Sequence, residues 1–118
     1  IGSPAMNILK GECQSNQIKL SSGATLKANS KHNGEVNVGL RPEDFTIDEK
    51  GTIKLKVELV ELIGANTLIH GRLENSNEIL VASIAGVISD SKIGNHINLS
   101  FNENKLHLFD INSDQRIN

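Results

Sequence analysis

The sequence is short of aromatic rings, cysteine and positive charge, and each shortage excludes a class of protein. It has 118 residues with three Phe and no Trp or Tyr, and its formal net charge is −2. It therefore lacks the aromatic platform and the basic groove that a nucleic-acid-binding barrel needs. Cys13 is the only Cys, so no internal disulfide can form and a small buried thiol is expected. No apolar run approaches the roughly 20 residues of a membrane-spanning helix, so no direct membrane insertion is expected.

The sequence also lacks the motifs of common catalytic sites. No Gly is followed by Lys, which excludes a phosphate-binding P-loop, and no Ser lies in a Gly-x-Ser-x-Gly turn. The four His residues form no cluster with Cys or carboxylates at the spacing of zinc ligands: they are His32, His70, His96 and His107. We therefore expect no catalytic residue, no metal and no cofactor in this chain. The chain starts at Ile1 without a Met or a secretory signal, so we expect it to be part of a longer protein.

Short apolar segments and frequent turn signals predict an all-β barrel or sandwich. Residues 53–59 alternate between apolar and charged, which gives one buried and one wet face. The alternation reverses after Leu59, so a bulge is expected near Leu59–Val60. Further strands are predicted at 67–73, 79–84, 97–101 and 105–109, with a loop at 89–95.

The first third of the chain predicts a smaller unit of the same kind. Short strands are expected at 8–13, 18–20, 25–28 and 35–41. Asn33-Gly34 is a strong hairpin signal because both residues tolerate positive φ. Residues 42–51 are expected to form a connector, with a helical turn at Pro42–Asp44.

The segment Val38–Glu43 is an apolar strand that runs into Arg-Pro-Glu. Pro42 fixes its own φ and pushes Arg41 into an extended conformation. The strand therefore presents a cation and a carboxylate together where it ends. Two interpretations stay open: a local ion pair worth about 0–1 kcal/mol, or an interface with another domain.

Four blocks of the sequence together resemble the C-terminal domain of sugar-import ABC transporter ATPase subunits of the maltose and glycerol-3-phosphate type. The blocks are Gly2–Asn7, Gly39–Glu43, the stretch from Val60-Glu61 through Gly64 to His70, and His107–Asp110 followed by Arg116. They occur in the family order over the whole chain. One departure is that Ser113-Asp114 replaces the Thr-Gly of the family, which puts the conformation of that last turn in question.

The resemblance implies a single transport-associated OB-type domain over residues 1–118. Residues 43–118 would form the main barrel strands and residues 1–42 a smaller β unit. It also implies a non-catalytic accessory, regulatory and dimerisation role, with ATP and Mg bound only by an ATPase domain upstream of Ile1. The implied partners are a second copy of the subunit, the permease subunits through the ATPase domain, and a cytoplasmic regulator. The implied location is the cytoplasmic face of the bacterial inner membrane.

The matching positions are the candidate interface residues: Arg41, Pro42, Glu43, Gly64, His70, Phe109, Asp110 and Arg116. Each has a plainer structural interpretation. Gly64 suits a turn, Phe109 is more often a core residue than an exposed one, and Asp110 suits a cap or turn.

Two alternative functions compete with the accessory role. A nucleic-acid-binding module conflicts with the composition. A small-oxyanion module, as in related molybdate-binding barrels, needs converging N–H or hydroxyl groups. Ser21-Ser22-Gly23 and Ser89–Lys92 offer such groups, although no compact motif requires that use.

Overall fold

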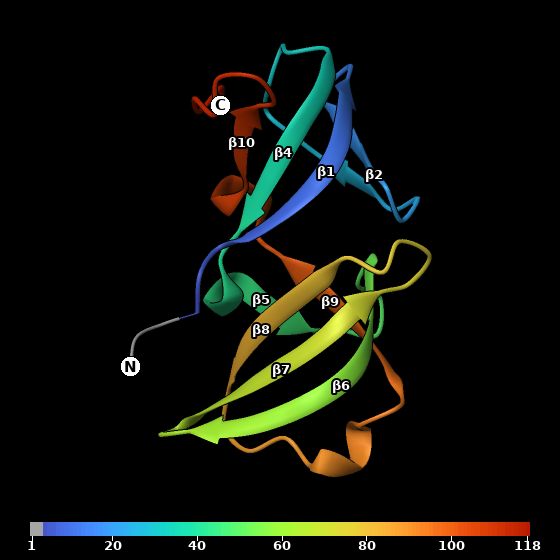
Figure 1. Cartoon of the computed structure of the whole chain (residues 1–118), viewed down its shortest axis with the longest axis vertical. Helices are drawn as coiled ribbons and strands as arrows, with labels where there is room; N and C mark the ends of the chain where they lie inside the picture. The colour runs from blue at the N-terminus through green and yellow to red at the C-terminus, as the bar shows by residue number, and fades with distance from the viewer. Residues whose placement is uncertain (1–3) are drawn as a thin grey trace.

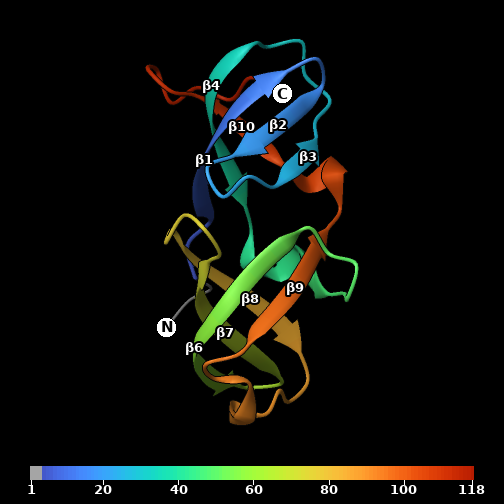
Figure 2. The ribbon, with the colours of Figure 1, turned by 90° about the vertical axis from the view of Figure 1, so that its right-hand side faces the viewer.

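A computed structural model of the chain describes residues 4–118 as an all-β protein, which confirms the predicted fold class. Gly2 and Ser3 of the opening block lie outside the described residues. The strands form two five-stranded antiparallel sheets, which lie one above the other along the long axis of the molecule (Figures 1 and 2). The molecule measures 40 × 29 × 21 Å.

The first sheet has the order β10-β4-β1-β2-β3. Its strands are β1 (Asn7–Gln14), β2 (Gln17–Leu20), β3 (Thr25–Lys27), β4 (Gly34–Leu40) and β10 (His107–Asp110). The hairpin predicted at Asn33-Gly34 is wrong, because β3 pairs only with β2 while β4 pairs with β1 and β10. Gly34 does adopt a positive φ of 119°, but it starts a strand on the far side of β1. A dipeptide signal fixes a local turn and does not fix which strands pair.

The second sheet has the order β5-β9-β6-β7-β8. Its strands are β5 (Phe45–Ile47), β6 (Ile53–Ile63), β7 (Asn66–Leu73), β8 (Ile79–Ala85) and β9 (His96–Phe101). The expected bulge exists, but the register shifts between Val57 and Leu59, slightly earlier than predicted. Leu59 is consequently 46% exposed instead of buried. Strand β5 was missed, because three residues are too few to show an alternation.

The chain crosses between the two sheets at two short 3-10 turns. The first, η1 (Pro42–Asp44), follows β4 and confirms the predicted helical turn. The second, η3 (Glu103–Lys105), leads from β9 into β10; the remaining turn, η2 (Asp90–Lys92), lies in the loop after β8. Since β10 pairs with β4, the last strand belongs to the sheet of the smaller unit, and a boundary at residue 42 does not separate the two sheets.

One hydrophobic core runs through both sheets. Its largest fully buried side chains include Leu9, Val38 and Leu108 from the first sheet and Ile53, Leu55, Ile69 and Leu99 from the second. Cys13 is 1% exposed, as expected for a structural thiol, and burial raises its pKa. A deeply buried thiol of raised pKa is a poor nucleophile.

Candidate functional site

The candidate residues gather at two places. Arg41, Pro42, Glu43, Phe109, Asp110 and Arg116 lie around β4, β10 and the first crossing between the sheets. Gly64 and His70 lie on the β6–β7 hairpin of the second sheet. Three blocks that are far apart in the sequence therefore meet on one side of the first sheet. We call this surface, formed by Met6, Ile8, Arg41, His107, Phe109 and Arg116, the β10 face.

The Arg-Pro-Glu segment takes the predicted conformation. Arg41 has φ −76° and ψ 141°, which is extended, and Pro42 is buried at the first position of η1. Arg41 and Glu43 are both exposed, and no ion pair joins them or links either one to another residue within 4–118. The local ion pair that the sequence left open does not form, so both charged groups face solvent at the crossing.

Phe109 packs on the outer surface of the first sheet. It is half-buried, so the expectation of a core residue is wrong. Its ring lies 6.3 Å from the His107 ring and nearly parallel to it, at 8°. Gly39 on β4 lies beneath, and a side chain there would collide with the Met6 sulfur and the Phe109 ring. The glycine of the Gly-Leu-Arg-Pro-Glu block is therefore needed for close packing, and it leaves a flat ring partly open to solvent.

Two arginines and one aspartate lie near this aromatic pair. Partial burial lowers the pKa of His107, and the nearby guanidinium groups of Arg116 and Arg41 lower it further, while Asp44 acts in the opposite direction. His107 thus lies near two permanent cations, Arg41 and Arg116. An apolar ring with two guanidinium groups in its neighbourhood suits a partner that offers both apolar and acidic groups.

Asp110 and Arg116 hold the C-terminal segment beside β10. The Asp110 carboxylate accepts hydrogen bonds from the N–H groups of Asn112 and Ser113 at 2.8 and 3.0 Å, which confirms its turn role. These bonds lower its pKa. Arg116 forms an isolated bridge with Phe109. Asp114, where the family has Gly, adopts the left-handed φ of 59°, so the turn keeps the conformation that glycine allows.

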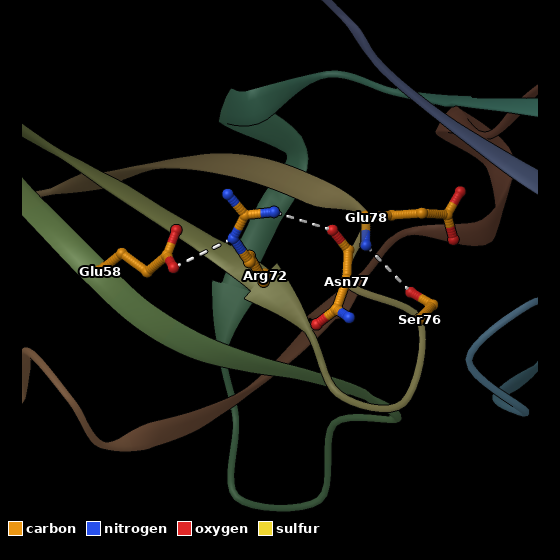
Figure 3. Close-up of polar contacts among 5 residues, drawn as sticks. All are labelled: Glu58, Arg72, Ser76, Asn77 and Glu78. Atoms are coloured by element: carbon orange, nitrogen blue, oxygen red, sulfur yellow. Dashed lines mark hydrogen bonds and ion pairs between the residues drawn. The ribbon is translucent and has the colours of Figure 1, made fainter.

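The block from Val60 to His70 forms the β6–β7 hairpin, and one side-chain contact joins its two strands. Gly64 has φ +61° in the two-residue turn between Ile63 and Asn66, which confirms its turn role. His70 Nε2 lies 2.6 Å from Glu61 Oε1, across the two strands that this turn joins. The Glu and His of the block are therefore a cross-strand pair. Arg72 and Glu58 form a second such pair at 3.1 Å, near the bulge (Figure 3).

Sequence reasoning missed the role of Asn7. Its side chain is 7% exposed and donates to the C=O groups of Leu40 and Val81 at 3.0 and 2.9 Å. It also accepts from the Val81 N–H at 2.8 Å. The amide thus joins the first sheet to the edge of β8 in the second. The position of Asn7 in the opening block was the only signal for this role in the sequence. Its partner Val81 lies 74 residues further along the chain, so no local pattern could identify it.

The groups suggested for an oxyanion site are used within their own turns. The Gly23 N–H bonds Leu20 O, and the Ala24 N–H bonds the Ser22 hydroxyl. The Ser91 N–H likewise bonds the Ser89 hydroxyl. These turns leave no converging set of free N–H groups of the kind that anion sites use.

The remaining chemistry gives little support for other ligand classes. Phe45 is buried against the half-buried Phe101 in an edge-to-face pair, so no cluster of exposed aromatic rings is available for stacking within residues 4–118. Within residues 4–118, no three His, Cys, Asp or Glu side chains are placed to hold a metal ion. The same part of the chain contains no helix long and apolar enough to span a membrane.

Comparison with known proteins places these features in a family. A family described as "MalK OB fold domain" matches residues 2–45, and one described as "TOBE domain" matches residues 38–109. The chain is 38% identical over 117 residues to the sn-glycerol-3-phosphate import ATP-binding protein UgpC of Ruegeria pomeroyi, covering 99% of this chain and 33% of the relative. It is 31% identical over 133 residues to the oligosaccharides import ATP-binding protein MsmX of Bacillus subtilis, covering 99% and 36%. The chain thus spans about a third of the length of the curated relatives it matches.

A solved structure supports the fold. The cytoplasmic molybdate-binding protein ModG is similar with a TM-score of 0.69 at 14% identity, over 92% of this chain and 98% of that one. At this identity the likeness establishes the architecture alone. The matched domains are non-catalytic, in agreement with the missing P-loop. The chain belongs to the family of MalK-type OB-fold and TOBE domains that sugar-import ABC ATP-binding subunits contain.

Proposed function

We propose that this domain is the accessory and regulatory part of the ATP-binding subunit of a bacterial ABC importer for a carbohydrate or glycerol-3-phosphate. It helps to hold two subunits together and offers the β10 face to a regulatory protein or to a neighbouring domain. The observation that carries the proposal is the meeting of three sequence blocks on that face, through Met6, Arg41 and His107–Arg116. The Arg41 guanidinium on this face is exposed and makes no ion pair within residues 4–118, so it is available to a partner.

Nucleotide binding belongs to another domain of the subunit. ATP and Mg are bound by the nucleotide-binding domain of the subunit, which also contacts the permease at the cytoplasmic face of the inner membrane. This chain has no glycine-rich loop to donate N–H groups to phosphates. A calorimetric titration of the chain with Mg-ATP is therefore flat. Saturable binding in the micromolar range would contradict the assignment.

The decisive experiment compares Arg41→Ala and Glu43→Ala in this chain and in the full-length subunit. Both side chains are exposed and unpaired. The free energy of unfolding of each variant of the chain therefore stays within about 0.5 kcal/mol of the parent value. In the full-length subunit, the same variants change transport-coupled ATPase activity or its response to a regulator. Lys19→Ala, which removes an exposed cation from β2, is the matched control and changes neither. A large loss of melting temperature in the chain, together with normal activity of the full subunit, would overturn the proposal.

A further inference from the structure

The Asn33-Gly34 pair forms no hairpin and lies outside the β10 face. It ends the loop 28–33, which connects β3 to β4 without regular structure at the upper end of the molecule in Figure 1. Asn33 is the only Asn of the sequence that precedes a Gly. A side-chain amide meets least hindrance from the following peptide when that residue is glycine, because no Cβ stands beside the nitrogen.

The side chain of Asn33 is free to react with that peptide. Asn33 is exposed, and its amide forms no hydrogen bond within residues 4–118. The amides of Asn7 and Asn118 are instead held at strand edges. Asn118 accepts from the Leu108 N–H and donates to the Leu106 C=O, both at 2.8 Å. A carboxamide fixed in this way cannot turn toward the next backbone nitrogen, whereas that of Asn33 can.

The Gly34 nitrogen is the group that Asn33 can meet. Gly34 forms the last pair of the β1–β4 ladder, opposite Cys13, so only the terminal pair has to open to free its N–H. The φ of Gly34 is +119°, and a Cβ built there would have no atom within 4 Å except His32 Nε2. The space around this peptide is therefore open enough for a ring to close.

His32 places a base beside the same peptide. Its Nε2 lies 3.9 Å from the position that a Cβ of Gly34 would take, which is a short distance from the Gly34 N–H. The His32 N–H donates to the hydroxyl of the buried Ser30 at 3.1 Å, and this bond holds the residue in place. An imidazole in this position can accept the proton of an attacking nitrogen as a general base.

We propose that Asn33 is a site of self-catalysed deamidation with His32 as the general base. The Gly34 nitrogen gives its proton to His32 Nε2 and forms a bond to Cγ of Asn33. The Cγ–Nδ2 bond breaks, and the amide nitrogen leaves as ammonia when it takes the proton from His32. Water then opens the succinimide at either carbonyl, which leaves an aspartate or an isoaspartate at position 33.

The product changes the start of β4. It adds a carboxylate two residues before Glu35 and near Asp110, which is close enough to His32 for an electrostatic interaction. The isoaspartate form also inserts a CH2 group into the backbone directly before Gly34, where the ladder with β1 begins. Because β4 also pairs with β10, both changes act on the sheet that carries the β10 face.

The test follows the loss of ammonia in the folded chain by peptide mass mapping, with isoaspartate detected by enzymatic methylation. Asn33 converts roughly tenfold faster than Asn29, an exposed Asn of the same loop that precedes Ser30 and therefore a Cβ. His32→Gln slows the conversion of Asn33 severalfold and leaves that of Asn29 unchanged. The matched control is Lys31→Gln, which removes the neighbouring exposed side chain and keeps the parent rate.

A comparison with the chain unfolded in guanidinium chloride separates the structure from the sequence. Asn33 converts at least as fast in the folded chain, because only there does Ser30 hold His32 in place. A folded rate far below the unfolded rate would show that the pair with Cys13 protects the Gly34 nitrogen, and would overturn the proposal. Equal rates in the parent and in His32→Gln would overturn the assignment of His32 as the base. A conversion of Asn33 no faster than that of Asn29 would remove the site altogether.

Discussion

Replacement of Asn7 should weaken the whole domain, because one side chain joins the two sheets. Asn7→Ala removes three hydrogen bonds of 2.8–3.0 Å: two to Val81 and one to Leu40. Each is worth about 1 kcal/mol net, so the variant should lose about 3 kcal/mol. For a domain of this size the corresponding fall in melting temperature is about 10 °C. Since native domains are stable by only about 5–15 kcal/mol, the loss is a large fraction of the total.

Urea unfolding of Asn7→Ala measures this loss, with Asn104→Ala as control. Asn104 is exposed and its side chain forms no hydrogen bond within residues 4–118, so its removal should cost under about 0.5 kcal/mol. If both variants lose the same small amount, the reasoning about the inter-sheet amide is refuted.

Asn7→Asp adds a dependence on pH. The introduced carboxylate keeps the bond from the Val81 N–H but turns an oxygen toward two carbonyl groups. Burial beside these oxygens raises its pKa above that in the unfolded chain. The variant is therefore most stable below the pKa that this carboxyl group has in the unfolded chain. It loses stability as pH rises through the pKa of the same group in the folded chain. The variant should be closer to the parent at about pH 4 than at about pH 7.

Two further predictions concern the C-terminal turn. The N–H groups of Asn112 and Ser113 lower the pKa of Asp110, so its contribution is present above the unfolded pKa and is lost as pH falls through the folded pKa. Asp110→Asn keeps an acceptor oxygen and should remove this acid-dependent loss in thermal melts between about pH 2 and pH 6, whereas Glu103→Gln should not. Asp114→Gly should stabilise the domain by up to about 1 kcal/mol in urea unfolding, because φ is +59° and glycine adopts it without strain. A loss of stability on this change would show that the Asp114 side chain contributes more than its backbone strain costs.

Local chemistry accounts for the parts of the fold that the sequence predicted. The extended Arg41, the turn at Pro42–Asp44 and the turn at Gly64 follow from the steric limits of the residues themselves. The reversed alternation in β6 predicted a bulge to within two residues, because the side-chain period of a strand is two. Phe109 was misplaced because apolar character does not say which face of a strand is covered.

Pairing between distant segments accounts for what was missed. Asn33-Gly34 has the chemistry of a hairpin, yet β4 pairs with β1 over seven positions and with β10 over four, whereas β3 has only three residues. The partners of Asn7 and Asn118 follow no local rule, since a side-chain amide bonds whichever strand edge the fold brings near.

The sequence by itself determined an all-β domain of the importer ATP-binding type without ATP-binding chemistry of its own. Period, turn residues and motif order are local properties, and they are readable in order along the chain. Only the tertiary structure decided that β10 returns to the first sheet, that Arg41, His107 and Arg116 share one face, and that Asn7 joins the two sheets. These features depend on contacts between residues far apart in the chain, where the burial of the common core selects one pairing over its alternatives.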